Sequence, residues 1–336
     1  MDIRDTGKAI GNLRKKAGLT QQQLAVALNV SDKAVSKWER GLSCPDISLL
    51  PKISILLDTD IESLLYGHHF QHKAHWCGIL ILDKNSEITP IRMIYNKPLV
   101  YFWLSYFMLI GIKDILIIND YGDVEMLLGD GRQYGITLQY NINWNNFAKG
   151  RSVALYQGST VLYGMDLTKI CQRAMANSIG ASILAICGGS ELAEVELFFD
   201  YKHKVIADKS ARASLDHYYQ GPFLFCPVEI WEKTDAFGKG YEEVLYQLKK
   251  GSNLYVELIG RGMQRFSVTT EDELLDFAQF VKVTQRNSRE QIACLEEIAW
   301  RRGLISTNQL RDLIEQQNNR RLKDYLNKLS KGGNHQ

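Results

Sequence analysis

Residues 20–41 read TQQQLAVALNVSDKAVSKWERG, and this stretch predicts two short helices joined by a tight turn. Thr20 is a candidate N-cap of the first helix, since its hydroxyl can accept a hydrogen bond from a free backbone N–H. Leu24, Ala25 and Leu28 follow at helical spacing and give that helix one apolar face. Asn29 suits the turn because asparagine tolerates a left-handed backbone.

The second helix of the pair is predicted to begin after Ser31, another candidate N-cap, and to end at Gly41. Val35 and Trp38 lie three positions apart and are expected to point inward. The stretch therefore predicts a helix-turn-helix, in which the second helix is the one that enters the major groove of DNA.

The polar residues that this packing does not use are those that a DNA contact needs. Amides at a helix N-terminus suit phosphates, and side chains on the outer face of the second helix reach base edges. The candidate DNA-binding residues are Gln21, Gln22, Ser31, Asp32, Lys33, Ser36, Lys37 and Arg40.

Residues 5–65 resemble the phage-repressor/Cro-type (XRE) helix-turn-helix family. The matching motifs are L-T-Q-x-x-L-A at Leu19–Ala25, K-W-E-R-G at Lys37–Gly41 and P-D-I-x-x-L at Pro45–Leu50. The resemblance implies binding to a double-stranded DNA operator. The alternative is a small helical bundle used for protein contacts.

The charge of this region alone does not suggest DNA binding. Residues 1–66 hold nine Lys or Arg and eight Asp or Glu, which is a net charge of only +1. Because phosphate contacts supply much of the affinity for DNA, we expect two such domains to act together in a homo-oligomer, a dimer or a tetramer.

Further apolar helical patterns complete a five-helix domain over residues 1–66. They cover Asp5–Lys16, Asp46–Leu57 and Asp60–Leu65. Residues 67–75 read as a linker. Their histidines, His68, His69, His72 and His75, lack acidic or cysteine partners, so we do not expect a metal site there.

Composition indicates a globular, cytoplasmic protein. Of the 336 residues 45% are hydrophobic, and the net charge is +2. The six cysteines form no C-x-x-C pair and no signal peptide precedes them, so we expect buried thiols. They are Cys44, Cys77, Cys171, Cys187, Cys226 and Cys294. The longest apolar run, Leu99–Ile112, is too short to cross a membrane, and no cofactor is expected.

From Trp76 on, buried strands alternate with helices, which predicts a doubly wound, Rossmann-like α/β domain with a mostly helical C-terminal part. The predicted strands are 78–82, 115–118, 137–141, 153–156, 182–187, 195–199 and 223–225. The predicted helices are 99–110, 122–128, 271–283, 288–302 and 307–329. We assign this domain to residues 76–330, with a tail at 331–336.

Residues 76–330 resemble the sugar-1-phosphate nucleotidyltransferases, and most of all the glucose-1-phosphate thymidylyltransferases. The motifs that carry the resemblance occur in the order of that family. They are residues 97–118, 129–140, 162–170, 260–262, 271–281 and 292–305.

The resemblance also implies which catalytic parts are missing. The phosphate-binding loop G-G-x-G-T-R-L of the family is replaced by Asp83–Glu87, and its two metal-binding aspartates fall at Ser159 and Ser267. Hydroxyls are poor ligands for Mg²⁺, and carboxylates repel phosphates. Thr89 stands near the position of the catalytic lysine, only Lys209 remains of E-K-P, and G-L-A-Q is missing around 146–150. We therefore expect no enzymatic activity, no catalytic residues and no metal.

Other stretches match the regulatory site that thymidylyltransferases carry at a subunit interface. The residues that the resemblance implies for a ligand are Tyr163, Gly164, Gly260, Arg261, Gly262, Ala293, Cys294, Glu297, Ile298 and Arg301. An arginine between glycines lets backbone and guanidinium approach a diphosphate together. The alternative is that these residues serve subunit packing alone.

The sequence thus favours a DNA-binding transcriptional regulator whose second domain binds a thymidine nucleotide or nucleotide sugar. One alternative is an active nucleotidyltransferase with an accessory DNA-binding domain, and another is an assembly scaffold without a ligand. The operator, the effector, the sign of regulation and the regulated pathway are not encoded in any motif that we identify.

Overall fold

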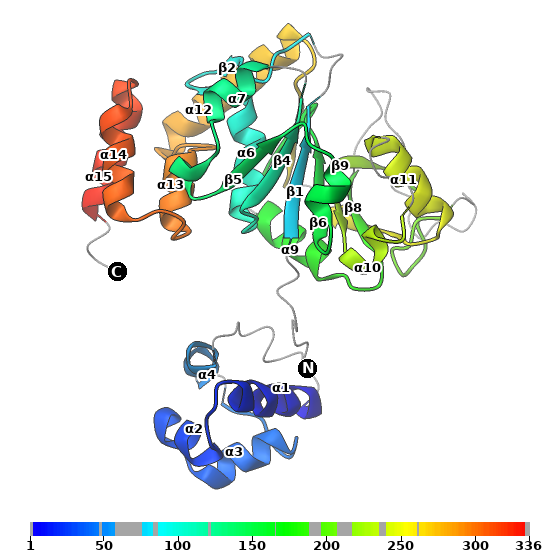
Figure 1. Ribbon diagram of the computed structural model, residues 1–336, viewed down its shortest axis with the longest axis vertical. Coiled ribbons are helices and arrows are strands. Elements are labelled where there is room, and N and C mark those ends of the chain that lie inside the picture. The colour runs from blue at the N-terminus through cyan, green and yellow to red at the C-terminus, as the bar shows by residue number, and fades with distance from the viewer. Residues whose placement is uncertain are drawn as a thin grey trace. The chain divides into compact units, whose positions relative to one another are not determined.

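The chain divides into two compact units, residues 1–74 and 75–336 (Figure 1). The computed structural model describes residues 3–46, 49–57, 76–82, 87–119, 122–164, 166–187, 196–206, 217–234, 240–260 and 262–332. The predicted linker with its four histidines and the predicted fifth helix, Asp60–Leu65, lie outside these residues. Among the described helices, none combines the length and the apolar character that a membrane crossing requires.

The described part of unit 1 contains helices and no strand. Its helices are α1 (Ile3–Lys16), α2 (Gln21–Leu28), α3 (Asp32–Glu39) and α4 (Leu50–Leu56). The prediction that the fourth helix begins at Asp46 was wrong, since α4 begins at Leu50. Pro51 then lies in the first turn of α4, where a missing backbone N–H breaks no helical hydrogen bond.

The turn between α2 and α3 is held by the residues that its sequence indicated. The Thr20 hydroxyl accepts from Gln23 N, and the Gln23 side chain accepts from Thr20 N, which completes a capping box. Asn29 has φ 56° and ψ 47°, the left-handed conformation. The Ser31 hydroxyl accepts from Ala34 N and caps α3. These local features fix the start of α2, the turn at Asn29 and the start of α3.

One apolar cluster holds unit 1 together. Ile10 of α1, Leu24 of α2, Val35 of α3 and Ile53 of α4 are all fully buried in it, and Trp38 is 5% exposed. Each helix therefore contributes one face to a shared core, as the helical spacing of apolar residues predicts.

Unit 2 is built on a seven-stranded sheet with the strand order β10-β8-β9-β6-β1-β4-β5. The strands are β1 (Trp76–Ile81), β4 (Asp114–Ile118), β5 (Thr137–Tyr140), β6 (Ser152–Gln157), β8 (Ala181–Cys187), β9 (Tyr218–Cys226) and β10 (Leu254–Ile259). Most neighbours run parallel, but β9 is antiparallel to both β6 and β8. Two small antiparallel pairs accompany the sheet. These are β2 (Met93–Ile94) with β3 (Lys97–Pro98), and β7 (Thr160–Tyr163) with β11 (Gln264–Ser267).

Helices cover both faces of this sheet, so unit 2 is a three-layer α/β/α structure. Along β1, Leu80 joins one core cluster and Ile79 joins the other, because successive side chains of a strand point to opposite faces. On the Leu80 face lie α6 (Leu99–Leu109), α7 (Gly122–Leu128), α9 (Leu167–Ala176), α12 (Glu271–Ser288) and α13 (Leu295–Arg301). On the Ile79 face lie α8 (Trp144–Ala148), α10 (Val228–Trp231) and α11 (Tyr241–Lys250).

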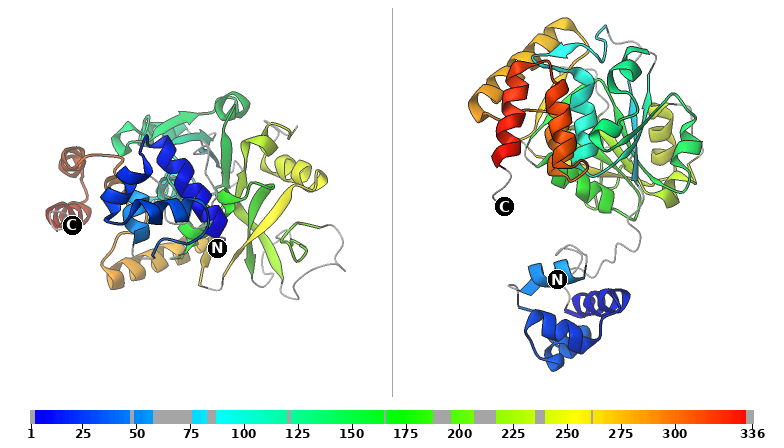
Figure 2. Two further views of the ribbon diagram at one scale, coloured as in Figure 1. Left: turned by 90° about the horizontal axis from the view of Figure 1, so that it is seen from below. Right: turned by 60° about the vertical axis from the view of Figure 1, so that its left-hand side comes forward.

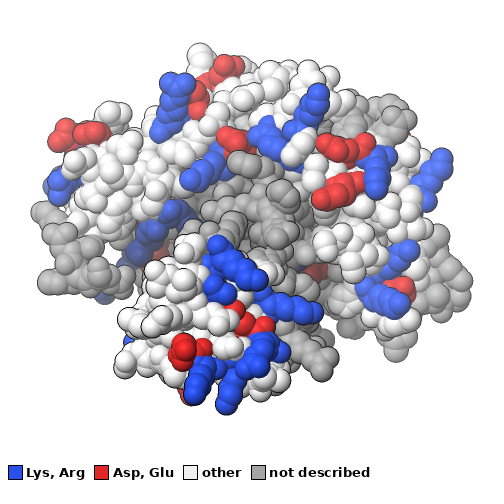
Figure 3. All heavy atoms as spheres, turned by 60° about the horizontal axis from the view of Figure 1, so that its bottom comes forward, with Lys and Arg blue, Asp and Glu red and all other residues white. Residues whose placement is uncertain are grey.

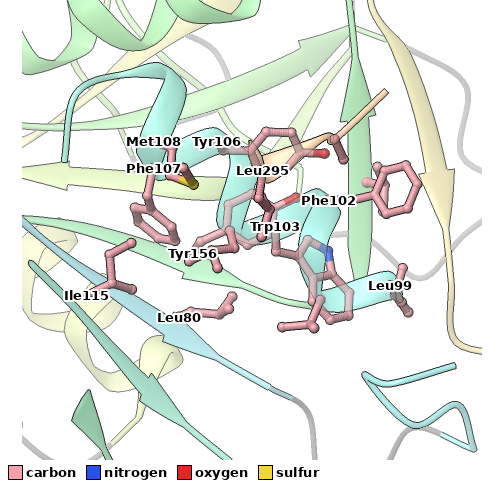
Figure 4. Close-up of a cluster of buried hydrophobic side chains, with 14 of the residues drawn as sticks. Leu80, Leu99, Phe102, Trp103, Tyr106, Phe107, Met108, Ile115, Tyr156 and Leu295 are labelled. Atoms are coloured by element: carbon pink, nitrogen blue, oxygen red, sulfur yellow. The ribbon is translucent and has the colours of Figure 1, made fainter. Parts of the chain in front are cut away.

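Several aromatic side chains pack together on the Leu80 face (Figure 4). Tyr156 and Phe223 of the sheet meet edge to face with ring centroids 4.6 Å apart, and Phe107 of α6 lies 5.7 Å from Phe223. Trp103 of α6 donates its indole N–H to Thr160 O. Helix α6 is buried on nearly all sides, which explains why its sequence is an unbroken apolar run.

Strand order reverses between β1 and β6. From β1 the chain proceeds outward to β4 and β5, and it then returns to place β6 on the other side of β1. Ligands of open α/β sheets bind beyond the carboxyl ends of the strands at such a reversal. A ligand site is therefore expected at the residues that follow Ile81 and Gln157.

Three predicted elements differ from the structure. Residues 196–199 form only isolated bridges and no strand. The predicted helix 288–302 is helical only from Leu295 to Arg301, after left-handed residues at Arg289 and Ala293. The predicted helix 307–329 is two helices, α14 (Thr307–Gln316) and α15 (Arg320–Gly332), which lie side by side (Figure 2). Asn319 accepts from Leu322 N and caps α15.

A buried lysine has a partner in the segment between α12 and α13. Lys97 is 2% exposed and donates to Gln291 Oε1 at 2.8 Å and to Asn96 Oδ1 at 3.3 Å. Burial lowers the pKa of Lys97, while the nearby Cys294 and Glu296 act in the opposite direction. A buried ammonium group needs partners, and Gln291, in the segment between α12 and α13, is one of them.

Replacing Gly135 with alanine is expected to destabilise unit 2 by about 2 kcal/mol or more, because two effects add. Gly135 has φ +68°, and a Cβ there would lie 2.3 Å from the backbone oxygen of Leu304. Chemical unfolding followed by circular dichroism measures this loss.

The matched control is Gly129→Ala, which has φ +58° but no atom within 4 Å of the added Cβ. Its cost is backbone strain alone, about 1 kcal/mol. If Gly135→Ala and Gly129→Ala lower the free energy of unfolding equally, the backbone of Leu304 does not lie close to Gly135 in solution.

Candidate nucleic-acid interface and nucleotide site

The outer face of α3 presents two lysines to solvent. Val35 and Trp38 turn inward, so Lys33 and Lys37, four positions apart, share the opposite side of the helix and are exposed. Within the described residues, the side chains of Lys33, Lys37 and the exposed Gln22 make no hydrogen bond or ion pair. These three side chains are therefore available to an external partner.

Other candidate residues of this surface are engaged within unit 1. Ser31 caps α3, and Asp32 Oδ1 accepts from Lys33 N at 2.7 Å. The Arg40 guanidinium donates to Ser36 O at 3.2 Å, and Ser36 itself is half-buried. Gln21 donates to Glu39 Oε2 at 2.7 Å. All eight candidate residues thus lie on α2 or α3 or at the ends of α3. Gln21, Ser31, Asp32 and Arg40 also make hydrogen bonds within unit 1.

An ion pair beneath this surface was not foreseen from the sequence. Arg14 of α1 donates to both carboxylate oxygens of Glu39 of α3, at 2.5 and 3.0 Å, and also to Leu19 O. Both side chains are 10% exposed. Burial disfavours the ionised form of Glu39, but the hydrogen bonds from Arg14 and Gln21 outweigh it and lower the pKa of Glu39. No local pattern links positions 14 and 39, so only the fold reveals this pair.

The charge on unit 1 is mixed, in keeping with its small net value. Figure 3 shows both basic and acidic side chains on the face of unit 1 turned to the viewer. A mixed surface of this kind gives weak non-specific attraction to a polyanion. Affinity for DNA would therefore depend on Lys33, Lys37 and their neighbours on α3, and on the number of such units.

In unit 2, Ser159 and Ser267 lie side by side at the strand-order reversal. Ser159 follows β6, and its carbonyl accepts from Val268 N at 3.1 Å. Thr160 and Ser267 are paired in the β7–β11 ladder. Gly158 N donates to Ile81 O, which places this pair of serines beside the end of β1. The fold therefore brings together the two positions at which the resemblance implied metal-binding aspartates.

The one described carboxylate that interacts with Ser267 has a structural role. Glu273 Oε2 accepts from Thr269 N, Thr269 Oγ1 and Thr270 N, and so caps α12. Burial disfavours ionised Glu273, but hydrogen bonds from Thr269 and Ser267 outweigh it and lower its pKa. Among the described residues, no group of three or more His, Cys, Asp or Glu is placed to hold a metal ion.

Asparagines occupy the strand ends next to this position, and their side chains are used locally. Asn141, with φ 49°, accepts from Asn119 N at 2.8 Å, which ties the end of β5 to the end of β4. Asn143 accepts from Asn145 N and Asn146 N and caps α8. The segment in which the resemblance implied a missing G-L-A-Q is therefore a short capped helix.

Some candidate positions are outside the described residues. They are 83–86 of the replaced phosphate loop, Lys209 and Arg261. Glu87 and Thr89 are described, and both are exposed.

The first group of candidate ligand residues lies on the β7–β11 pair. Tyr163 pairs with Gln264, and its ring packs edge to face on Phe280 of α12 with centroids 5.2 Å apart. A Cβ at Gly164 would lie 2.7 Å from the Met263 sulfur, so a larger residue there would have to displace the Met263 side chain. The structure thus joins Tyr163 and Gly164 to the segment of Gly260 and Gly262, both of which are exposed.

The second group lies on and before α13. Glu297 accepts from Arg301 Nε at 2.7 Å and from the Tyr325 hydroxyl at 2.7 Å. The Arg301 side chain is 60% exposed, and its hydrogen bond to Glu297 raises its pKa. Ile298 is half-buried. Ala293 and Cys294 are only 8% and 1% exposed, so their side chains offer no surface to a ligand. No described hydrogen bond, ion pair or ring contact joins this group to the first one.

A helix-turn-helix domain joined to a nucleotidyltransferase-like α/β domain is the class that this fold defines. Comparison with family models supports the first part, since residues 10–64 match a helix-turn-helix family. The second part is similar to glucose-1-phosphate thymidylyltransferases of several bacteria, at 27–30% identity.

The protein from Neisseria meningitidis is 30% identical over 271 residues, which cover 74% of this chain and 92% of the relative. The protein from Xanthomonas campestris is 28% identical over 280 residues, covering 74% and 91%. The protein from Mycolicibacterium smegmatis is 29% identical over 256 residues, covering 69% and 86%. The chain belongs to the glucose-1-phosphate thymidylyltransferase family, and it carries a helix-turn-helix domain before the part shared with these relatives.

Proposed function

We propose that this protein is a DNA-binding transcriptional regulator whose nucleotidyltransferase-like unit is catalytically inactive, binds a nucleotide or nucleotide sugar, and forms homo-oligomers. The observation that carries the proposal is the adjacency of Ser159 and Ser267 at the end of β1. Ligand binding to such a unit would change the affinity of the preceding helix-turn-helix for DNA.

Binding to DNA is supported by the free cationic face of α3. Lys33 and Lys37 point away from the core, and α3 is capped and anchored by its own side chains. A rigid helix with unpaired lysines on one face fits the major groove.

The absence of catalysis is supported by the chemistry at the strand-order reversal. Transfer of a nucleotidyl group requires cations that offset charge on the phosphates. Two hydroxyls stand where the resemblance places carboxylate ligands, and the Glu273 carboxylate next to them is committed to capping α12. Neutral hydroxyls hold Mg²⁺ poorly.

Ligand binding is supported by the exposed Arg301 on α13, since a guanidinium suits a phosphate group. An effector could change the affinity for the operator only if it binds two arrangements of the protein with different affinity. The alternative is that this region serves subunit contacts and binds no ligand.

The experiment that tests the proposal is a thermal-shift titration with thymidine and uridine nucleotides and their sugar derivatives, with and without Mg²⁺. A ligand at 100 times its dissociation constant adds about 2.7 kcal/mol to stability. We expect a Mg²⁺-independent stabilisation by thymidine compounds. If none of these compounds stabilises the protein, the unit is an assembly scaffold and sensing is refuted.

Replacing Arg301 with alanine is expected to abolish the ligand-induced shift and to leave DNA binding unchanged. The Arg301 side chain is 60% exposed, so water screens its ion pair with Glu297. Loss of this ion pair is expected to cost less than about 1 kcal/mol of stability. The matched control is Arg311→Ala on α14, an exposed arginine whose guanidinium, within the described residues, hydrogen-bonds to Asn308 and to no other side chain. Loss of both ligand response and DNA binding in Arg301→Ala would assign Arg301 a structural role.

The second candidate function, an active nucleotidyltransferase with an accessory DNA-binding domain, is favoured by the similarity to thymidylyltransferases over most of their length. It predicts release of pyrophosphate from a nucleoside triphosphate and a sugar 1-phosphate in the presence of Mg²⁺. We expect no release above the rate without protein.

A further inference from the structure

The outer face of α12 combines exposed apolar side chains with charged ones. Its inner face, with Leu274, Phe277 and Val281, is buried in the core of unit 2. On the outer face, Leu275 is 64% exposed and Val283 is 49% exposed. Leu275 and Val283 lie on one stripe of the helix, so both can add apolar area to the same contact.

The charges on this outer face follow a symmetric order. Seven residues lie on it at helical spacing and all are exposed: Asp272, Leu275, Asp276, Gln279, Lys282, Val283 and Arg286. These residues form pairs at equal distances on either side of Gln279. Asp272 and Arg286 are seven positions from it, and Leu275 and Val283 are four positions from it. Asp276 and Lys282 are three positions from it. Reversing the direction of the helix therefore exchanges every acidic side chain with a basic one and every apolar side chain with an apolar one.

We propose that α12 packs against α12 of a second copy of this chain, antiparallel, with a two-fold axis at Gln279. This inference rests on the homo-oligomer of the proposed function and names its surface. In a two-fold contact the same patch serves both partners, so the patch must complement itself. Asp272 would face Arg286 of the partner subunit, Asp276 would face Lys282 of the partner subunit, and Leu275 would cover Val283 of the partner subunit.

Within the described part of a single copy, these charges have no partner of opposite sign. In the described part of the chain, none of Asp272, Asp276, Lys282 and Arg286 has a hydrogen-bond or ion-pair partner. Asp272 and Asp276 lie one turn apart, as do Lys282 and Arg286, and like charges at that spacing repel each other. An antiparallel partner places the opposite charge against each pair and removes this repulsion.

The helix dipole explains only part of the pattern. It favours acidic residues in the first turn and basic ones in the last, which accounts for Asp272 and Arg286. It does not account for Asp276 and Lys282, which lie in the interior of α12, because the effect fades beyond the terminal turns. It also offers no reason for the exposed Leu275 and Val283.

The surface continues onto the β2–β3 pair, which lies next to α12 (Figure 1). Arg92 forms an ion pair with Glu271, and Met93 and Tyr95 are 55% and 41% exposed. The seven residues on α12 span about 21 Å. A stable interface buries about 800 Å² on each partner, so these neighbouring apolar side chains supply area that one helix face lacks.

Charge reversal tests the inference, with sedimentation velocity or light scattering as the readout of mass in solution. The variant D272K/D276K makes the face all basic, and K282E/R286E makes it all acidic. Each is expected to lose one level of assembly, which halves the mass. The quadruple variant D272K/D276K/K282E/R286E is self-complementary again and is expected to regain the wild-type mass. Mixing the two double variants is expected to do the same.

The matched control is D123K/E125K on α7, which reverses two exposed carboxylates elsewhere on unit 2. It is expected to keep the wild-type mass. The inference is overturned if the double variants keep the mass of the control, or if neither the quadruple variant nor the mixture regains assembly. A wild-type chain that is monomeric at tens of micromolar would overturn the proposed homo-oligomer as well, so the two failures are distinguishable.

Discussion

Reversing the charge of Lys33 or of Lys37 is expected to lower the affinity for the operator by about 100-fold or more. Each lysine lies on the exposed face of α3 and occurs once in every copy of unit 1, so a dimer on DNA loses two contacts. A base or phosphate contact contributes about 1–3 kcal/mol, and about 2.7 kcal/mol corresponds to 100-fold. A glutamate adds repulsion from the phosphates.

The measurement requires an operator, which selection from a pool of random duplexes provides. Fluorescence anisotropy then compares Lys33→Glu and Lys37→Glu with Lys113→Glu, an exposed lysine of unit 2 whose reversal changes the net charge equally. We expect the control to bind like the wild type. Wild-type affinity in both α3 variants would mean that α3 does not read the operator.

Removing one partner of the Arg14–Glu39 pair is expected to destabilise unit 1 by about 3–5 kcal/mol. Either change, Arg14→Ala or Glu39→Ala, leaves a buried charge without its partner, and Glu39→Ala also frees the Gln21 amide. A domain of this size has a total stability of only about 5 kcal/mol, so unit 1 would unfold near room temperature and lose DNA binding.

Chemical unfolding of the single variants and of the double variant measures this coupling. The double variant is expected to lose clearly less than the sum of the single losses, because it leaves no unpaired buried charge. Additive losses would show that the two groups do not interact in solution. Gln22→Ala on the exposed start of α2 is the neutral control.

The same pair makes the stability of unit 1 depend on pH. The pKa of Glu39 is lower in the folded unit than in the unfolded chain, so the ionised carboxylate stabilises the fold at neutral pH. That contribution is present above the unfolded pKa and is lost as the pH falls through the lowered folded pKa. Glu39→Gln is expected to abolish this part of the acid sensitivity.

Much of unit 1 could be predicted because its signals are local. Thr20, Asn29 and Ser31 act on backbone groups within three residues, so residue type and spacing suffice to place the turn. The strands β1 and β4 of unit 2 were equally plain, since strands buried on both faces are unbroken apolar runs. The family of each part also follows from its motifs.

Contacts between distant residues required the folded structure. The Arg14–Glu39 pair joins α1 to α3, and nothing near either residue indicates it. The buried Lys97 donates to Gln291, 194 positions away, which lies where the predicted helix 288–302 is not helical. In the same way, the antiparallel direction of β9 depends on its neighbours β6 and β8 and not on its own sequence.

The sequence by itself therefore determined the helix-turn-helix and the α/β character of unit 2, and the resemblance predicts that Ser159 and Ser267 stand at the positions of the family's two aspartates. The tertiary structure decided that Ser159 and Ser267 meet at the end of β1 and that Glu273 beside them caps a helix. It also decided that the symmetric face of α12 is turned to solvent. The physical reason is the separation along the chain over which each interaction acts. Helix capping and apolar periodicity involve residues a few positions apart. The partners of a buried charged group are brought together only when the whole chain has packed.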